Sequence, residues 1–344
     1  MKAIRIHKHG DVNVLKIDDL EVPSPHPDEI LVKIKASALN HLDLWVRNGI
    51  PNVPLPLIMG SDGAGIVEQL GDNVKNKAPF TKGDEVFIVP FRTCGICSYC
   101  LCGAEQLCAQ YRILGEYING TQAEYITAPW DYLLPKPKNL TLQEAAAFPL
   151  AFLTAYHMLV KKVHLNPLDW VLIWGAGSGI GSAAIQIAKL YGARIITTAS
   201  SQEKMDFALE NDADFVINYL TENVSARIKE ITNNRGVDLI FEHVGKESWQ
   251  HSLRSLAKGG KIITCGATTG AKVSIDLRHL FLKHQQIIGS TMGTRGDLVE
   301  IMKWIEEEKI KPIVYKSFHF SEIKQAHQIL ETDQQRGKIV VLFE

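Results

Sequence analysis

The sequence has no surplus of charge of either sign, because 37 Lys and Arg residues stand against 38 Asp and Glu residues over 344 positions. Binding to a nucleic-acid backbone or an anionic membrane requires an excess of basic residues, so this balance argues against both partners. The chain also lacks an apolar run of the ~18 residues that span a bilayer. Residues 1–7 alternate like a β-strand and lack the apolar core of a signal peptide. We therefore expect a cytoplasmic protein with no nucleic-acid and no membrane partner.

Cysteine is scarce outside one segment, since five of the six cysteines lie between residues 94 and 108. Four of them, Cys94, Cys97, Cys100 and Cys108, have the spacing C-x2-C-x2-C-x7-C. Four thiolates on a short loop can close a tetrahedron around Zn²⁺ and leave no open position for a substrate. Disulfides are the alternative, but a cytoplasmic chain rarely keeps them, and bridges between such close neighbours are strained. We predict one structural zinc per chain, with Cys102 as a bystander.

A glycine-rich turn between a strand and a helix is the strongest pattern in the second half of the chain. The apolar residues 171–174 run into glycines at positions 175, 177, 179 and 181, and 182–191 then has the pattern of a helix. Such a turn exposes backbone N–H groups and the positive end of a helix dipole, which both favour a pyrophosphate. The strict GxGxxG spacing is not met, because Ile180 stands at its last position. We predict dinucleotide contacts from Gly175, Gly177, Ser178, Gly179 and Ile180.

The rest of the chain divides into two patterns, as expected for two domains in a chain of this length. Before the turn, short strands separated by glycine and proline predict a barrel-like β domain; they are 30–36, 65–70 and 84–89. After it, strands alternate with helices, which predicts a doubly wound parallel sheet; these strands are 194–198, 214–217, 237–241, 261–264 and 286–289. A further helix is expected at 297–308 and a last strand at 338–342.

Three motifs make the chain resemble one known family. They are ALNHLD at 38–43, GSDGAG at 60–65 and GDEV at 83–86. With the glycine turn, they resemble the medium-chain dehydrogenase/reductase superfamily over essentially the whole chain. The resemblance implies an α/β fold class, with a GroES-like β-rich catalytic domain and a Rossmann domain. We expect the first at 1–149 and 310–344 and the second at 150–309. A small-molecule substrate and a homodimer or homotetramer are also expected.

The resemblance raises the question of a second, catalytic zinc. In the zinc alcohol dehydrogenases a Cys, a His and a further Cys or acidic residue hold that metal, and by motif alignment Asn40, Ser61 and Leu150 occupy these places. Asn and Ser are poor zinc ligands and Leu is none. The proton relay of those enzymes falls on Leu42 and Trp45, which cannot carry protons. A substitute metal site is the open alternative; it would use His41, Asp43 and Asp62.

Other segments resemble the zinc-free quinone reductase branch instead. They are Asn40-x-x-Asp43, 60–62, 145–150 and 153–156. This branch implies hydride transfer between a nicotinamide and a carbonyl or an activated C=C, with hydrogen-bond donors in place of a metal. We expect Asn40 and His41 as donors and Asp43 and Trp45 as pocket residues. The alternatives are an alcohol dehydrogenase and, more remotely, a non-catalytic binding protein on the same fold.

The end of the second Rossmann strand bears on the choice between NAD and NADP. An acidic residue there would bind the adenosine ribose and repel a 2′-phosphate, but Ala199 stands at this position. Ser200 and Lys204 could bind the phosphate, and Tyr219 matches a cofactor-contacting tyrosine of NADP-dependent quinone reductases. We therefore favour NADP(H), with Ser200 and Glu203 as a helix capping box being the competing interpretation. Two more cofactor contacts are expected by resemblance, from Thr154 and Gly266.

Overall fold

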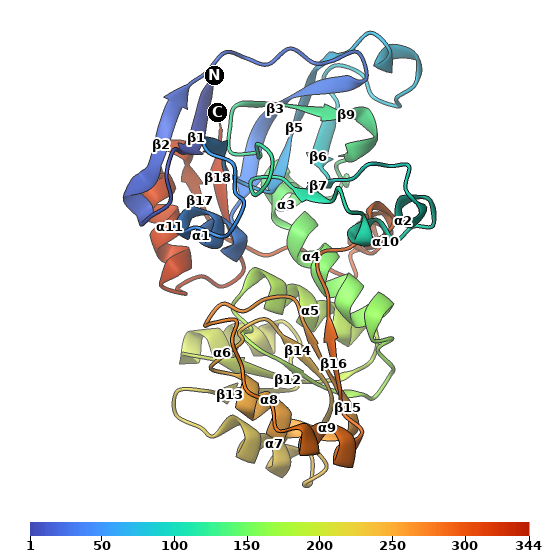
Figure 1. The fold of residues 1–344 in the computed structure, drawn as a ribbon, viewed down its shortest axis with the longest axis vertical. Coiled ribbons are helices and arrows are strands. Elements are labelled where there is room, and N and C mark those ends of the chain that lie inside the picture. The colour runs from blue at the N-terminus through green and yellow to red at the C-terminus, as the bar shows by residue number, and fades with distance from the viewer. Residues whose placement is uncertain (344) are drawn as a thin grey trace. The chain divides into compact units, whose positions relative to one another are not determined.

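The computed structural model describes residues 1–343 and, within that range, every side chain but that of Asn76. It divides into two compact units, one formed by Met1–Ala151 with the chain from Thr294 onward, and one formed by Phe152–Gly293. The elements of both are labelled in Figure 1. Among the described residues, no helix combines the length and the apolar composition that crossing a membrane requires.

The first unit is built mainly on antiparallel strands, with one parallel pair, β17 and β18. Its main sheet has seven strands in the order β10-β6-β5-β3-β18-β17, with β9 paired to β3, and a second sheet has the order β2-β1-β4. The strand bounds are β1 Lys2–Ile6, β2 Leu15–Asp19, β3 Glu29–Ala38, β4 Leu57–Ile58, β5 Asp62–Leu70, β6 Glu85–Ile88, β7 Phe91–Arg92, β8 Arg112–Ile113, β9 Tyr125–Pro129, β10 Leu133–Pro135, β17 Val314–His319 and β18 Lys338–Leu342. The strands expected before the glycine turn correspond to β3, β5 and β6, and the last one to β18.

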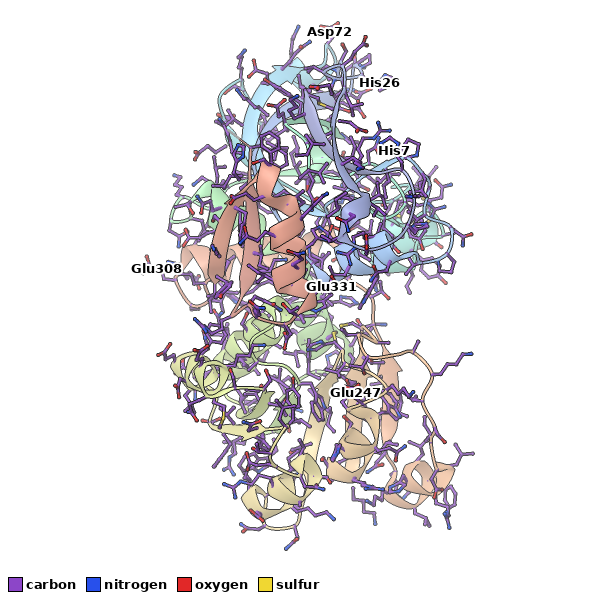
Figure 2. All side chains as sticks on the ribbon, turned by 90° about the vertical axis from the view of Figure 1, so that its left-hand side faces the viewer. His7, His26, Asp72, Glu247, Glu308 and Glu331 are labelled. Atoms are coloured by element: carbon purple, nitrogen blue, oxygen red, sulfur yellow. The ribbon has the colours of Figure 1, made fainter. Side chains whose placement is uncertain are left out.

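The helices of the first unit are short. Their bounds are α1 His41–Asn48, α2 Ser98–Leu101, α3 Leu142–Ala147, α10 Arg295–Glu306 and α11 Ile323–Glu331, and in α4, Pro149–Tyr156, the chain passes into the second unit. The side chain of Arg47 on α1 is fully buried, and its Nη2 lies 2.7 Å from Oε1 of Glu331. Glu331, labelled in Figure 2, is the last residue of α11. Nη1 of Arg47 lies 3.5 Å from Nδ1 of the buried His327.

The return of the chain to the first unit begins at Thr294, whereas the sequence placed it at residue 310. The reason is α10, which corresponds to the helix expected at 297–308 and is held inside the first unit. Asn139 Nδ2 donates to the carbonyl oxygen of Ile305 at 2.7 Å. The first residue of the helix, Arg295, forms an ion pair with Glu105. Contacts across more than 150 residues therefore decide the unit to which this helix belongs.

The second unit has a six-stranded parallel sheet in the order β13-β12-β11-β14-β15-β16. The bounds are β11 Trp170–Ile173, α5 Gly179–Leu190, β12 Arg194–Ala199, α6 Gln202–Glu210, β13 Phe215–Asn218, α7 Val224–Ile231, β14 Val237–Glu242, α8 Trp249–Ser255, β15 Leu256–Thr264, α9 Leu277–Lys283 and β16 Gln286–Gly289. This is the doubly wound order, in which the direction of winding changes between β11 and β14. Ligands of such sheets bind at the carboxyl ends of the strands at that point. The doubly wound parallel sheet expected from the sequence is confirmed.

Candidate active site and metal centre

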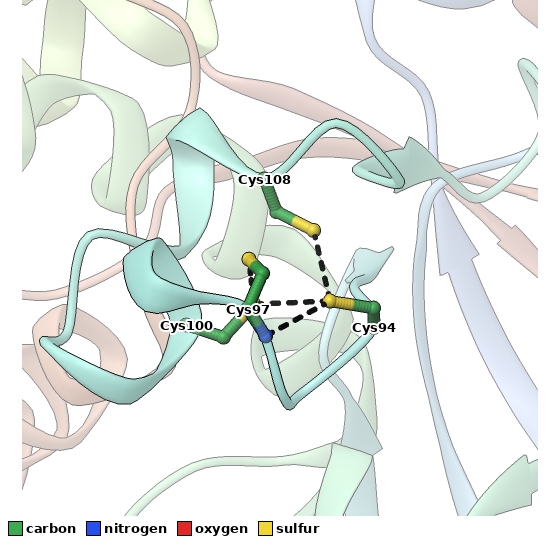
Figure 3. Close-up of side chains that lie close together, drawn as sticks. All are labelled: Cys94, Cys97, Cys100 and Cys108. Atoms are coloured by element: carbon green, nitrogen blue, oxygen red, sulfur yellow. Dashed lines mark hydrogen bonds between the residues drawn. The ribbon is translucent and has the colours of Figure 1, made fainter.

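The four cysteines predicted as zinc ligands come together in one cluster (Figure 3). Sulfur–sulfur distances are 3.5 Å for Cys97–Cys100, 3.5 Å for Cys94–Cys108 and 3.9 Å for Cys94–Cys100, and all four sulfurs lie within 4.8 Å of one another. Four thiolates at about 2.3 Å from one Zn²⁺ would stand about 3.8 Å apart, so the cluster fits the metal. Backbone N–H groups of Ile96 and Cys97 lower the pKa of Cys94 to about 6, whereas burial and the neighbouring sulfurs raise the pKa of Cys97 to about 11, so Cys94 is the first of the two to become the thiolate that a metal binds.

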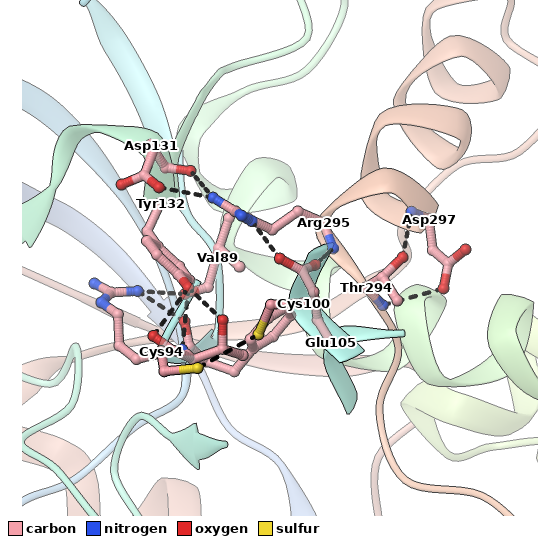
Figure 4. Close-up of polar contacts among 12 residues, drawn as sticks. Val89, Cys94, Cys100, Glu105, Asp131, Tyr132, Thr294, Arg295 and Asp297 are labelled. Atoms are coloured by element: carbon pink, nitrogen blue, oxygen red, sulfur yellow. Dashed lines mark hydrogen bonds and ion pairs between the residues drawn. The ribbon is translucent and has the colours of Figure 1, made fainter. Parts of the chain in front are cut away.

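Residues 94–108, here called the cysteine lobe, are tied to α10 by a cluster of charged and aromatic side chains that the sequence did not reveal (Figure 4). Arg295 donates from its backbone N and its Nε to the two carboxylate oxygens of Glu105, both at 2.7 Å, and from Nη1 to Asp131 at 2.8 Å. Its guanidinium lies 4.7 Å from the ring centre of Tyr132. The hydroxyl of Tyr132 accepts the backbone N–H of Thr93 at 3.0 Å, next to Cys94. Both sides of the lobe are therefore anchored.

The glycine-rich turn forms a tight turn at the N-terminus of α5. Gly175 has φ +68°, and a Cβ added at Gly181 would lie 2.1 Å from the carbonyl oxygen of Gly175, so glycine is required at both positions. Ser178 is the N-cap: its hydroxyl accepts the Gly181 N–H at 2.9 Å and donates to the Gly175 oxygen at 2.8 Å. The helix therefore begins at Gly179, three residues earlier than expected. The first turn of a helix has N–H groups without helical acceptors, so the turn fits a dinucleotide phosphate.

The residues expected at the adenosine ribose lie at the ends of two neighbouring strands. Ala199 ends β12, and its carbonyl oxygen accepts the backbone N–H of Tyr219 at 3.1 Å. The N-cap of α6 is Ser201, whose hydroxyl accepts the N–H of Lys204 at 3.4 Å. The capping box proposed for Ser200 and Glu203 is therefore wrong by one residue. Either of the two adjacent serines could cap a helix by its residue type, and α6 begins directly after the second.

Two further cofactor candidates also lie in the second unit. The Thr154 hydroxyl donates to the sulfur of Met292 at 3.7 Å and the residue is 4% exposed. Gly266 follows β15, and its carbonyl oxygen accepts the hydroxyl of Thr264 at 3.2 Å. Neither contact tests the role expected of these two residues, which stays a prediction.

Sequence reasoning missed a polar cluster at the end of β14, beside the glycine turn. Glu242 is fully buried, and its carboxylate accepts the backbone N–H groups of Val244 and Gly245 and the hydroxyls of Ser248 and Ser252, all within 3.1 Å. His243 Nε2 lies 2.8 Å from the carbonyl oxygen of Trp174. The cluster thus fixes the loop at the switch point of the sheet. An acidic residue that closes an apolar strand is the one sequence signal that could have indicated it.

Strand pairing gathers the candidate catalytic residues of the first unit. β3 pairs with β5 so that Ala38 faces Asp62, and β18 pairs with β3 so that Val340 faces Ala38. As a result Asn40, Asp62 and Lys338 meet in a buried cluster in which none is more than 8% exposed. Lys338 Nζ lies 2.5 Å from Asn40 Oδ1 and 3.1 Å from Asp62 Oδ2, and Asn40 Nδ2 donates to Asp62 Oδ2 at 2.9 Å. Lys338, read from the sequence only as the start of a strand, was missed.

The other candidates lie on α1, which begins directly after Asn40. The Asp43 carboxylate accepts the backbone N–H of Asn40 at 2.7 Å and that of Gly60 at 3.1 Å, so it caps the helix and holds the next loop. Burial raises the pKa of Asp43 to about 7. His41 and Trp45 are half-buried on the same helix. The structure thus gives Asp43 a local structural role, and a contact of Asp43, His41 or Trp45 with substrate stays a prediction.

Comparison with known proteins places this arrangement in a family. The model of the alcohol dehydrogenase GroES-like domain matches residues 26–138, and the model of the zinc-binding dehydrogenases matches residues 179–307. The chain is 34% identical to an NAD-dependent alcohol dehydrogenase of Sulfolobus acidocaldarius over 99% of both chains. The chain belongs to the medium-chain dehydrogenase/reductase superfamily. It is an oxidoreductase of this group, as the sequence motifs indicated.

Relatives within the superfamily differ in their named activities. The human quinone oxidoreductase is 28% identical over 100% of this chain and 98% of its own length. A crystal structure described as an NAD-dependent alcohol dehydrogenase is 41% identical, with a TM-score of 0.95 and full coverage of both chains. Membership in the superfamily therefore establishes the fold and the reaction class. The substrate has to be inferred from the residues of the site.

The residues at the catalytic zinc positions of this superfamily do not fit a zinc ion. Ser61 donates its hydroxyl to the carbonyl oxygen of Leu114 at 2.7 Å, and Leu150 contributes a backbone N–H to Asp62 at 2.9 Å. The third position, Asn40, is in contact with the ammonium of Lys338, which would repel a divalent cation. Among the described residues, the four-cysteine cluster is the only group of His, Cys, Asp or Glu side chains arranged to hold a metal.

Proposed function

We propose that the protein is an NAD(P)H-dependent reductase of activated C=C bonds and quinones that works without a catalytic metal. The observation that carries this proposal is the cluster around Asn40, one of the three catalytic zinc positions, where its carboxamide contacts the carboxylate of Asp62 and the ammonium of Lys338. When bound, the reduced nicotinamide supplies the hydride. The protein must then stabilise negative charge that develops on a substrate oxygen.

Hydrogen-bond donors of the first unit supply that stabilisation in this proposal. Asn40 is buried but keeps 8% of its surface exposed, and His41 follows it on the first turn of α1; in this proposal the substrate oxygen meets these two side chains. Donors of this kind suit an enolate or a quinol anion, whose charge is delocalised. An alkoxide concentrates its charge on one oxygen and depends more strongly on a Lewis acid such as zinc. The site therefore favours enones and quinones over simple ketones and aldehydes.

A turnover panel tests the proposal. Purified protein is assayed for NADPH and NADH oxidation with a quinone, 2-cyclohexen-1-one, cyclohexanone and an aldehyde, and for NAD(P) reduction with simple alcohols. We expect the quinone and the enone to have the highest kcat/KM. Faster oxidation of simple alcohols than reduction of either acceptor would instead establish the second candidate, an alcohol dehydrogenase, which the named activity of the Sulfolobus relative supports.

For the cofactor, we propose NADP(H) over NAD(H). Ala199 places no carboxylate at the ribose position, and Ser201, not Ser200, caps α6, so the Ser200 hydroxyl is not committed to that role. Lys204 lies on the first turn of the same helix, where a phosphate also gains from the helix dipole. The ratio of kcat/KM for NADPH and NADH measures this preference.

We also propose a cytoplasmic homodimer or homotetramer with a small-molecule substrate and no nucleic-acid or membrane partner. The balanced composition of 37 basic and 38 acidic residues supports the last part. Light scattering of the purified protein measures the oligomeric state, and a monomer at assay concentration would contradict it.

A further inference from the structure

The Lys338 ammonium is buried at the first residue of β18, where the side chain is 5% exposed. Its Nζ contacts two groups, Oδ1 of Asn40 and Oδ2 of Asp62. Burial of a charged amine is costly unless it is paired and hydrogen-bonded, and here the Asp62 carboxylate and the Asn40 amide oxygen supply both. We propose that Lys338 is a positioning residue that fixes the carboxamide of Asn40 with its oxygen turned inward and an N–H left for the substrate oxygen. This inference rests on the proposed function, in which Asn40 contacts that oxygen.

The three side chains determine the orientation of the carboxamide between them. An ammonium can only donate hydrogen bonds, and an ionised carboxylate can only accept them. The amide oxygen must therefore face Lys338, and the amide nitrogen must face Asp62. The structure has this orientation, with Oδ1 at 2.5 Å from Lys338 Nζ and Nδ2 at 2.9 Å from Asp62 Oδ2. In the flipped orientation the oxygen would meet the carboxylate and the NH₂ group would meet the ammonium. Both contacts would then be repulsive, so the charged pair selects one orientation.

The carboxylate that completes the cluster is itself held by the backbone. Asp62 Oδ1 accepts the N–H of Leu150 at 2.9 Å, while Oδ2 accepts from Asn40 and Lys338. The backbone N–H of Asn40 is bound by Asp43. Asp62 is thus held from α4 and Asn40 from α1.

One hydrogen of the Asn40 amide remains for a ligand. Nδ2 carries two hydrogens, and among the described residues its only acceptor is Asp62 Oδ2. Asn40 is also the most exposed member of the cluster, at 8%, compared with 4% for Lys338 and 0% for Asp62. The nearby ammonium also makes this N–H a stronger donor, because it draws electron density through the amide oxygen. A donor that is fixed before the reaction suits an oxygen on which negative charge develops.

A double-mutant cycle between Lys338 and Asn40 tests the inference. Lys338→Met removes the ammonium and keeps the length of the stem, and Asn40→Ala removes the donor, which we expect to lower kcat about 10²-fold. If Lys338 acts through Asn40, Lys338→Met lowers kcat at least tenfold by itself, and the double variant is no slower than Asn40→Ala alone. Losses that multiply in the double variant would show that Lys338 has a separate structural role, and would overturn the inference.

A matched control and a charge-neutral variant keep the test independent of folding. Lys136 is another lysine of the same unit with a side chain that is only 8% exposed, and its Nζ lies 3.3 Å from Oε2 of Glu85; Lys136→Met should leave kcat within about twofold. Lys338→Met leaves Asp62 buried without its cation. A second variant therefore combines Lys338→Met with Asp62→Asn, so that both charges are removed; it is called the neutral pair. This neutral pair should show the same loss of kcat, and the KM for the cofactor should be unchanged in all variants.

The readouts separate a failure of the inference from a failure of the proposed function. Turnover of the wild type in the substrate panel tests the function, and the cycle is run with whichever substrate the wild type turns over best. The exchange of the Asn40 side-chain amide protons with water, measured by NMR, needs no turnover. We expect slow exchange in the wild type and at least tenfold faster exchange in the neutral pair. Equal exchange in the two proteins would overturn the inference whatever the substrate.

Discussion

The anchor between the cysteine lobe and α10 allows a quantitative prediction for Arg295→Met. The substitution removes the charge-assisted hydrogen bonds from Arg295 Nε to Glu105 and from Nη1 to Asp131, at 2.7 and 2.8 Å. The Glu105 side chain is 6% exposed, so its carboxylate would stay buried with only the backbone N–H of residue 295. Loss of one partner of a buried pair costs about 3–5 kcal/mol, and because Arg295 is itself 30% exposed we expect about 2–3 kcal/mol.

Thermal unfolding measures this cost. For a domain of 150–250 residues, about 2–4 °C of Tm is lost per kcal/mol, so Arg295→Met should unfold roughly 4–12 °C below the wild type. Lys82→Met is the control, since Lys82 pairs with Glu68 at 2.7 Å in the same unit but is 68% exposed, and it should cost at most about 1 kcal/mol. A shift for Arg295→Met no larger than that of Lys82→Met would refute the reasoning. Zinc content, measured on both variants, shows whether the lobe keeps its metal.

Three further predictions concern the metal, the cofactor and acid stability. Cys100→Ser should lower Tm and promote aggregation with an unchanged cofactor KM, because metal binding contributes to folding; a stable variant that selectively lacks hydride transfer would contradict this. Ala199→Asp should shift the kcat/KM ratio from NADPH toward NADH by about tenfold or more, through one lost charge-assisted contact of ~1.5–3 kcal/mol; a wild type that already prefers NADH tenfold would refute the phosphate site. Burial, together with the nearby Arg47 charge, lowers the pKa of His327 to about 3, so the unfolded state binds a proton that the folded state does not between about pH 3 and 6.5. The free energy of unfolding should therefore fall as pH falls from 6.5, by up to ~1.4 kcal/mol per pH unit. Urea titrations at several pH values measure this free energy, and it should change less with pH in His327→Gln than in the wild type.

The sequence predicted those features that depend on neighbouring residues. The apolar strand 338–342 corresponds to β18, and the glycines from 175 to 181 form the strand–turn–helix unit at the start of the parallel sheet. The four-cysteine cluster could be found because its members lie on one short loop. Each of these patterns is complete within about 20 residues, so no knowledge of strand pairing is needed to see it.

Features that depend on distant contacts could not be read in the same way. Lys338 and Asn40 are 298 positions apart, and only the register of β18 on β3 brings them together. Arg295 and Glu105, 190 positions apart, similarly decide which unit contains α10. The N-cap of α6 is Ser201, and because Ser200 and Ser201 satisfy the same local pattern, the sequence alone could not decide between them.

The product formed from 2-cyclohexen-1-one and NADPH tests the central claim most directly. Hydride transfer to the activated C=C gives cyclohexanone, and hydride transfer to the carbonyl carbon gives 2-cyclohexen-1-ol; gas chromatography separates the two. A site in which a fixed Asn40 donor replaces the metal predicts cyclohexanone as the main product, formed by protein that contains one zinc per chain. The allylic alcohol as the main product, with a second equivalent of zinc needed for turnover, would contradict the account.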